Sequence, residues 1–509
     1  MMRTPWTLLA GLFLAAPVGS GQEARTAPAE VRLSLRECIH LALNHNLDVE
    51  ISRYQPWIDD QSVRAAFGTF DHVLYADGSS GRSHLAATSL LAGAPEVDNK
   101  SAILRTGVRR TLPIGALVDL SLSLDRQTTN SSFATLDPLW QESLGLSLTV
   151  PVLRGAGDAA NLTPILLARN TRRLSVDQFE KLLGDTVFAV QEAYWGLVST
   201  IEQKRFRDQA LEVARKLLED NKRRFERGVL AKVDVTQAES GVASQIEGIL
   251  TADNAVQDAM DRLKRLVDPA LLREDVTIVP VDAPPAPEGE LDERAAIERG
   301  LREAIEKRPD YRQIFVQLDS QDRSIEKARN DALPRINAIA SGSYTGIEDG
   351  FSGAADELRS ADTYAWTVGI SIEIPLENRT ASGAVRKGEL ERRRLLLQRR
   401  NLEDLILVEV RESVREIKTA EKRIEATRQA AVLAREQFEG EENRRDQGLR
   451  TTFHVLDARS KLTEALTNEV RARIDHATAW ARHRRATGML LAHHGILVES
   501  NLAPRHAVR

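Results

Sequence analysis

Three segments of the chain alternate between apolar and polar side chains, and the last two end just before long charged stretches. They are 115–126, 143–152 and 364–376, and 72–83, 102–112 and 335–346 show a weaker alternation. A period of two predicts β-strands with one apolar face. The opposite face is made of Ser, Thr, Gly and Asp. This pattern fits a soluble β-sandwich, and it also fits strands that turn their apolar face toward lipid.

Long helices follow the strands. Residues from about 162 to 227 contain no proline except Pro164, and at about 1.5 Å per residue they would extend for about 100 Å. Apolar residues recur at steps of three and four, as in a coiled-coil seam. The predicted seam residues are Val187, Val190, Tyr194, Leu197 and Ile201, then Leu211, Ala214, Leu218 and Phe225, and later Leu407, Val410, Val414, Ile417 and Ile424. So narrow a stripe suits a hollow wall better than a solid bundle.

Each long helix is predicted to end at a glycine and to return as a hairpin. Gly228 and Gly448 are typical helix-terminating residues, and a new amphipathic stretch begins near Asp234 or Thr452. The two hairpin tips are therefore expected near 228–234 and 448–454.

The chain repeats this strand-plus-helix unit. Gly145 corresponds to Gly369 at an offset of 224 residues, and Gly228 corresponds to Gly448 at an offset of 220. The opening helices correspond at an offset of 262, so the first copy is about 38 residues longer in its strand region. We expect a first repeat over 33–267 with strands over about 72–152, and a second over 293–492 with strands over about 335–376. A proline-rich irregular connector (268–292) separates them, and a tail (493–509) follows. The fold class is a mostly helical α+β protein built from a duplicated strand and coiled-coil hairpin unit.

The N-terminus predicts export. A short apolar run over 8–18 follows Arg3, and small residues at 18 and 20 predict a signal peptide over 1–20. The single cysteine, Cys38, allows no internal disulfide. A net charge of −5 and a pI near 6.1 argue against nucleic-acid binding. No apolar run of 18 residues follows the signal, which excludes a helical membrane span and leaves a membrane β-barrel open.

No pattern in the chain predicts catalysis or a cofactor. There is no nucleophile motif, phosphate-binding loop or paired-cysteine metal motif. His483, His493 and His494 lack the spacing with a carboxylate that would indicate a metal site. We therefore expect no enzyme, no cofactor and no bound metal. A secreted or periplasmic coiled-coil scaffold or adaptor remains the alternative to a membrane protein.

The order of these pieces resembles the TolC-like outer membrane efflux proteins (outer membrane factors). The resemblance runs from Leu33 to about Ala492. It rests on the opening A-L-x-x-N-x-D helix, on the two strand–Pro–long helix segments, and on the G-x-x-x-x-x-D-V-x-x-A tip from Gly228 to Ala238. The second tip keeps Gly448 and, at 455–458, the run Val-Leu-Asp-Ala.

The resemblance implies a homotrimer in the outer membrane. Its strands would form one β-barrel in outer-membrane lipid, continued by an α-helical barrel across the periplasm, with 268–292 in an equatorial region. The family members are passive exit ducts of tripartite efflux or type I secretion systems, without a cofactor. Their partners are a periplasmic adaptor (membrane fusion) protein at the hairpin tips and an inner-membrane transporter of the RND or ABC type. Members commonly have two strands per repeat, so the 38 additional residues imply either extra barrel strands or a hairpin beyond the membrane.

The resemblance also implies a gate at the tips. Asp234 and Arg450 match the positions of an acid and an arginine that link neighbouring hairpins, and Arg445 matches a tyrosine of that link. His454 and Asp457 match the positions of acidic constriction rings. The simpler interpretation is that Asp234 caps the returning helix, that Arg450 is a solvated surface residue, and that Gly228 and Gly448 only form turns.

Overall fold

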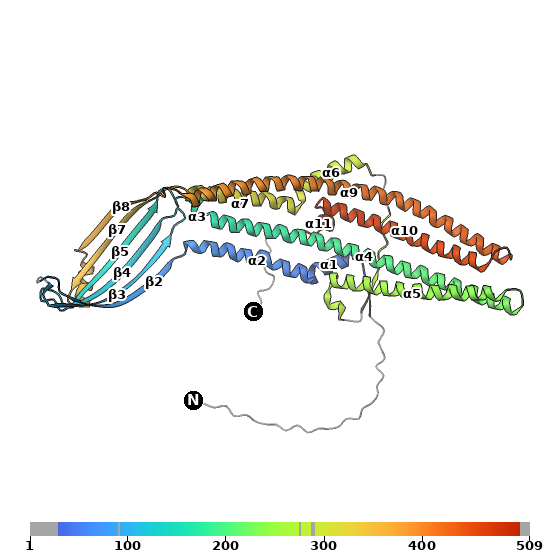
Figure 1. The fold of residues 1–509 in the computed structure, drawn as a ribbon, viewed down its shortest axis with the longest axis horizontal. Coiled ribbons are helices and arrows are strands. Elements are labelled where there is room, and N and C mark those ends of the chain that lie inside the picture. The colour runs from blue at the N-terminus through green and yellow to red at the C-terminus, as the bar shows by residue number, and fades with distance from the viewer. Residues whose placement is uncertain (1–28, 90–91, 274–275, 287–290, 499–509) are drawn as a thin grey trace, which may run out of the picture.

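The protein is elongated, with a β-sheet at one end and two helical hairpins reaching away from it (Figure 1). The computed structural model describes residues 29–89, 92–273, 276–286 and 291–498. The expected signal peptide at 1–20 and the end of the expected tail, from residue 499, lie outside the described residues.

All the strands expected from the alternating pattern belong to one antiparallel sheet of six strands in the order β2-β3-β4-β5-β7-β8. Their bounds are β2 Val73–Ala86, β3 Glu96–Thr111, β4 Leu117–Thr129, β5 Leu139–Pro151, β7 Arg335–Glu348 and β8 Tyr364–Glu373. The expected strand at 364–376 is shorter than predicted, because β8 ends at Glu373 before Pro375. The first repeat thus supplies four strands to the sheet and the second supplies two.

One face of the sheet is apolar across its whole width. In the register of the strands, Leu74 lies beside Val108, Val108 beside Leu120 and Leu120 beside Leu146. The same face continues on β8, where Trp366, Val368 and Ile370 are 72–73% exposed. The opposite face is polar: the Tyr75 hydroxyl donates to the Asp119 carboxylate at 3.0 Å, and the hydroxyls of Ser143 and Thr345 lie 3.0 Å apart.

The additional strands of the first repeat are inserted in the middle of its strand region. In both repeats, one strand follows the opening helices (β2 and β7) and another precedes the long helix (β5 and β8). Only β3 and β4 have no counterpart in the second repeat. They form a hairpin that pairs with β2 on one side and with β5 on the other.

The long helices form two hairpins, α4–α5 and α9–α10. Their bounds are α4 Thr163–Glu226, α5 Lys232–Val267, α9 Arg379–Asp446 and α10 Thr452–Ala486. The expected seam is buried at Val187, Val190, Tyr194 and Leu197, each 0–1% exposed. Farther along, Leu211 and Ala214 are buried as predicted, but beyond Ala214 the predicted phase was wrong, because Leu217 and Asn221 are buried while Phe225 is 44% exposed. In α9, Ile406 rather than Leu407 begins the buried stripe.

The opening helix of each repeat is broken once, at equivalent positions. Asn46 separates α1 (Leu35–His45) from α2 (Leu47–Phe67), and Arg308 separates α6 (Glu293–Lys307) from α7 (Pro309–Asp331). The two residues have nearly the same extended backbone, with φ −68° and ψ 124° at Asn46 and φ −66° and ψ 124° at Arg308. Both side chains are buried, so each break is held in place by polar contacts.

The proline-rich connector, which was expected to be irregular, contains regular structure, and so does the loop between β7 and β8. Within the proline-rich connector, η3 (Pro269–Leu272) is followed by β6 (Val276–Pro280), which pairs in parallel with β1 (Ala29–Leu33). The apolar Val276 and Ile278 are buried there, which offsets the cost of ordering the strand. The loop between β7 and β8 contains α8 (Phe351–Ser360), whose Phe351 packs edge-on against Trp140.

Shorter elements complete the chain: η1 (Gly68–Phe70), α3 (Asp158–Asn161) and α11 (Leu490–His493). Within the described part of the chain, every helix is too short or too polar to cross a membrane.

Because the seam of α4 is fully buried, Leu197→Ala should lower the free energy of unfolding by about 2–5 kcal/mol. Leu197 is 0% exposed, whereas Leu250 on α5 is 68% exposed. The matched variant Leu250→Ala should therefore change stability little. Denaturant titration followed by far-ultraviolet circular dichroism measures both, and equal losses would contradict the assignment of the seam.

Candidate functional site at the hairpin tips

The two hairpin tips have the same backbone structure. Gly228 has φ +73° and Gly448 has φ +77°, which is the left-handed region. The amide of Gly228 donates to Phe225 O and that of Val229 to Arg224 O, and the amides of Gly448 and Leu449 donate to Arg445 O and Arg444 O. This pair of bonds is the Schellman motif, in which a glycine ends a helix and satisfies its last carbonyls. The tips are thus sharp turns that begin the returning helices at Lys232 and Thr452.

Polar contacts join the two tips within one copy of the chain. The buried side-chain amide of Asn221 on α4 donates to Thr452 Oγ1 at 2.7 Å and to the backbone carbonyl of Asp234 at 3.2 Å. Arg445 on α9 lies 3.6 Å from the Asp220 carboxylate, and Arg224 lies 3.8 Å from Asp446. Below these contacts, a shared apolar cluster packs the hairpins together; it comprises Leu217, Phe438, Val455, Ala458 and Leu462.

The expected link residues are found at the tips, but they do not all meet. Arg445 links the hairpins through Asp220 and is only 12% exposed. Arg450 lies 3.3 Å from Glu441 of its own hairpin rather than against Asp234. Within the described residues, the Asp234 carboxylate forms no ion pair in the single chain. Asp234 also does not cap α5, since the N-cap is Ala231 and Asp234 lies in the first helical turn.

His454 and Asp457 lie on the first turns of α10, half-buried and on the same hairpin as Arg450. The Asp457 carboxylate lies 2.8 Å from Lys461, one turn away. The His454 ring lies edge-on to Phe453 with the ring centres 5.8 Å apart.

The sequence reasoning missed the residues that join the hairpins, above all Asp220, Asn221 and Thr452. A signal was present: Asn221 continues the buried positions Leu211, Ala214 and Leu217 of the α4 stripe. A single amide in an otherwise apolar seam is a common device for fixing register.

Each tip also exposes apolar side chains. Val229 and Val233 at the first tip are 76% and 60% exposed, and Leu449 and Phe453 at the second are 71% and 58% exposed. These four residues are equivalent in the repeat, at the offset of 220. We call them the tip patch. Such surfaces typically mark contact with another protein.

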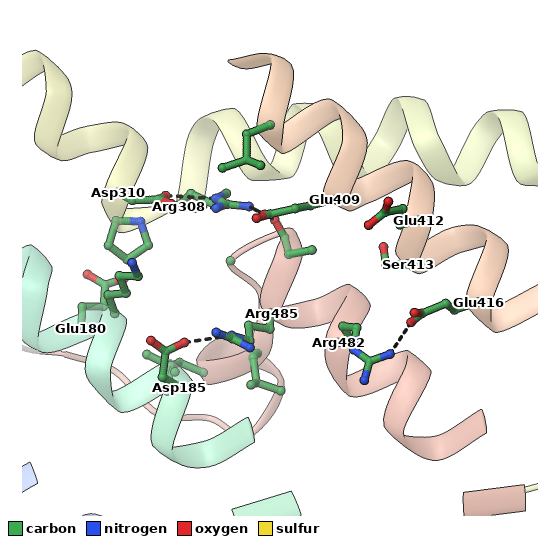
Figure 2. A pocket seen from close by; sticks show the side chains of 18 residues that line it. Glu180, Asp185, Arg308, Asp310, Glu409, Glu412, Ser413, Glu416, Arg482 and Arg485 are labelled. Carbon is green, nitrogen blue, oxygen red and sulfur yellow. Dashed lines mark hydrogen bonds and ion pairs between the residues drawn. The ribbon is translucent and has the colours of Figure 1, made fainter. Parts of the chain in front are cut away.

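A second polar cluster lies midway along the helices, around a cavity of about 400 Å³ shown in Figure 2. Arg308 points from the α6–α7 break to Asp310, with Nη2 2.7 Å from Oδ2, and it also pairs with Glu409 on α9. Its Nη1 donates to the carbonyl of Ala486 at the end of α10 at 3.0 Å. Arg482 reaches Glu416, and Arg485 reaches Asp185 on α4 at 2.8 Å (Figure 2).

These contacts connect the two repeats, and burial affects the pKa of the groups that form them. Burial by itself would raise the pKa of Asp310, but the hydrogen bonds and positive charge of Arg308 outweigh it and lower that pKa below its usual value. The charges around the cavity are largely paired with one another, as expected of a structural network. Among the described residues, no group of three or more His, Cys, Asp or Glu side chains is placed to hold a metal ion.

Paired strands with an apolar outer face, continued by two equivalent long hairpins, define a channel-forming type of protein rather than a catalyst. The profile of the family described as outer membrane efflux protein matches residues 117–267 and 300–489, and the chain belongs to this family. Membership places it in the outer membrane, with its helices extending into the periplasm. The family is one of transport proteins rather than of enzymes or soluble scaffolds.

Individual relatives are distant. The chain is 24% identical to the outer membrane protein TolC of Escherichia coli over 58% of its own length and 60% of TolC. It is 25% identical to the alkaline protease secretion protein AprF of Pseudomonas aeruginosa over 62% of its length and 64% of AprF. It thus spans about three fifths of these curated relatives. The CmeC outer membrane channel of Campylobacter jejuni shares the fold, with a TM-score of 0.64, 15% identity and coverage of 90% of this chain and 86% of CmeC.

The tip glycine Gly228 leads to a prediction that has a matched control, the helical glycine Gly440. Gly228→Ala places a side chain at a positive φ and should lower stability by about 1–2 kcal/mol, although no atom lies within 4 Å of the new Cβ. Gly440 lies inside α9 and also has open space around it, so Gly440→Ala should stabilise the protein by about 0.5–1 kcal/mol. Thermal unfolding of both variants measures the difference, and effects of the same sign would contradict this account of the tip.

Removal of Arg308 should be costly and pH-dependent. Arg308→Ala leaves the Asp310 and Glu409 carboxylates without their cation, at a cost of about 3–5 kcal/mol near neutral pH. Because the pKa of Asp310 is lowered from its ordinary value of 3.8, the stabilising pair is complete above about pH 4 and is lost as the pH falls through the folded-state pKa. The gap between wild type and variant should therefore narrow below pH 4.

The control is Arg482→Ala, whose partner Glu416 is 44% exposed. Exposed pairs contribute about 0–1 kcal/mol, so this variant should follow the wild type. Denaturant titrations between pH 3 and 7 distinguish the two, and a gap for Arg308→Ala that does not change with pH would contradict the role of the ion pair.

Proposed function

We propose that three copies of this chain form the passive outer-membrane exit duct of a tripartite efflux or type I secretion system. The sheets of the three copies form a β-barrel in outer-membrane lipid, and the helices form a tapered α-helical barrel in the periplasm. The observation that carries this proposal is the pairing of an apolar-faced sheet with two equivalent hairpins that end in matching tips.

The dimensions suit this role. Helix α4 has 64 residues, and at about 1.5 Å per residue it extends for about 96 Å. That length is about three times the hydrocarbon thickness of a bilayer, so the helices reach far beyond the membrane. A hollow wall of this kind needs no cofactor, because transport through it is passive.

The tips would form the gate. Asp234 and Arg450 do not meet within a copy, and the Asp234 carboxylate has no ion-pair partner among the described residues. An ion pair between Asp234 of one copy and Arg450 of its neighbour would give the Asp234 carboxylate a cation and hold the entrance closed. Arg445, which already joins the hairpins through Asp220, would hold the second tip in register, while His454 and Asp457 would line the constriction.

The energy for transport would come from partners. The tip patch of Val229, Val233, Leu449 and Phe453 is the surface that a periplasmic adaptor protein would contact, since it is apolar and lies at the far end from the sheet. An inner-membrane transporter of the RND or ABC type would bind the adaptor and drive the cargo. AprF, a relative of this chain, is named for the secretion of a protease.

The gate can be tested by the conductance of purified trimer in planar bilayers. Wild type should show a small conductance, and the double variant Asp234→Ala/Arg450→Ala a larger one, since each 1.4 kcal/mol removed from a closed state raises the open population about tenfold. Charge exchange (Asp234→Arg/Arg450→Asp) should restore the low conductance if the two groups pair directly.

The control removes an ion pair between α4 and α5 of the first hairpin, at a distance from its tip. Lys204 Nζ lies 2.5 Å from Asp253 Oδ1, and Lys204→Ala/Asp253→Ala should leave the conductance unchanged. A trimer whose conductance is the same in all variants would retain the duct and exclude the gate. Folded protein that neither trimerises nor conducts would exclude the duct.

A further inference from the structure

We infer that the channel closes as a barrel of eighteen strands, in which β8 of each copy pairs with β2 of the next. This inference rests on the proposed trimer and names the surface through which the copies meet. The surface consists of the two open edges of the six-stranded sheet, and its partner is a second copy of this chain.

The directions of the strands permit this pairing. Every neighbouring pair in the sheet is antiparallel, and six strands separate into three that run one way and three that run the other. Strands β2 and β8 therefore run in opposite directions, so β8 beside β2 of the next copy continues the antiparallel pattern without a break. An unpaired edge in lipid would leave backbone amides and carbonyls without partners, at several kcal/mol for each group.

The inserted hairpin is a full part of the wall. A row of residues runs across the sheet through Leu74, Val108, Leu120 and Leu146 on the apolar face. Next to this row on the polar face, Tyr75 of β2 reaches across β3 to Asp119 of β4. If β3 and β4 projected beyond the membrane, they would need neither an apolar face opposite a polar one nor the pairing of all 13 residues of β4 with β3.

The helices end at the same two edges as the sheet. Contacts between helices run in the order α2, α4, α7, α9, so α2 and α9 flank the helical layer as β2 and β8 flank the sheet. Figure 1 shows α2 continuing from β2 along one side of the molecule and α7 with α9 along the other.

Both outer helices expose an apolar stripe. On α2, Leu47, Ile51, Tyr54 and Ile58 follow heptad spacing and are 48–69% exposed. On α9, Leu390, Leu397 and Leu405 share one side and are 47–65% exposed. These stripes are continuous with the open sheet edges, so a second copy that pairs with β2 also covers α2 with its α9.

The consequence of eighteen strands is a wide barrel at the outer-membrane end of the channel. If both repeats had two strands, as the second repeat does, three copies would supply twelve strands instead of eighteen. Since barrel diameter grows roughly linearly with strand number, the barrel should be about 1.5 times wider than one without the inserted hairpin.

Cysteine cross-linking tests the closure. Ser79 and Ser83 on β2 and Thr367 and Ser371 on β8 belong to the polar face, and the four β2–β8 combinations of cysteine substitutions sample different registers. Mild oxidation in outer membranes should yield covalent dimers and trimers and no larger species. The native Cys38 does not interfere, because it is fully buried and burial raises the pKa of its thiol to about 12.

Two controls make the result decisive. The pair Ser143→Cys/Thr345→Cys joins neighbouring strands of one copy and should cross-link only internally. The pair Ser121→Cys/Thr367→Cys places one cysteine on β4 and the other on β8, which are not neighbours in the sheet. These strands run in opposite directions, as β2 and β8 do, but this pair should give no covalent trimer. A β4–β8 cross-link, a ladder beyond three copies, or an intact trimer without β2–β8 cross-links would overturn eighteen strands while keeping the channel. Absence of any trimer would overturn the proposed function as well.

A shortened variant tests the width independently. Deletion of 93–130 removes both strands of the inserted hairpin, β3 and β4, with most of their connecting segments, and preserves the antiparallel relation of β2 and β5. Its pore should exclude neutral polymers of about two thirds the diameter excluded by wild type, when they are applied from the sheet end. Equal exclusion limits for two conducting trimers would contradict a wall of eighteen strands.

Discussion

The burial of one stripe along α4 is the interaction on which the rest of the molecule depends. Helix α4 runs without interruption from the sheet to the first tip, and it contacts α2, α5, α7 and α10. Tyr194, at the centre of the stripe, is fully buried and donates its hydroxyl to Leu33 O and to the Asp282 carboxylate, each at 3.2 Å. The same side chain therefore ties the long helix to the start of the first repeat and to the connector that leads into the second.

The two repeats break their opening helices at equivalent positions but use different side chains to hold the break. At the helix break of the first repeat, Asn46 accepts from the amides of Asp48 and Val49 and donates to Leu266 O. At the equivalent break, Arg308 binds two carboxylates and a carbonyl. Both side chains hold the break through polar contacts in a buried place, but only the second brings charge into the interior and joins three helices. The copies have kept the geometry of the break and changed the groups that hold it.

The sequence was sufficient for features that depend on local chemistry. Alternation located all six strands of the large sheet, and glycines located both tips, because a period of two and a positive φ leave direct traces in the residue order. It was insufficient where tertiary contacts decide. Beyond Ala214, the buried positions of α4 are set by contact with the second hairpin, so Leu217 is buried in place of the predicted Leu218. Strand β6 exists because β1, far away in the chain, offers it a partner. Helix α8 is held by packing against the sheet.

The residues at the hairpin tips show the same difference between features set by local chemistry and features set by tertiary contacts. Gly228 and Gly448 were predictable, whereas the partners of Arg445 and Arg450 were not, since an arginine reaches carboxylates on several neighbouring turns. Asn221 was in principle detectable as a polar residue in an apolar stripe. Its bond to Thr452 connects helices that are 231 residues apart in the chain, and periodicity carries no information about such a distance.

The β3–β4 hairpin has a consequence for how such walls can evolve. A gain of two strands restores the original direction of the chain, so the strand that follows the insertion enters its helix with the same polarity and the same outward face. A gain of one strand would invert everything downstream. The circumference of the sheet can therefore grow or shrink in steps of one hairpin through a single duplication or deletion, without any compensating change in the helices. Lineages of this architecture are free to adjust the two ends of the conduit separately.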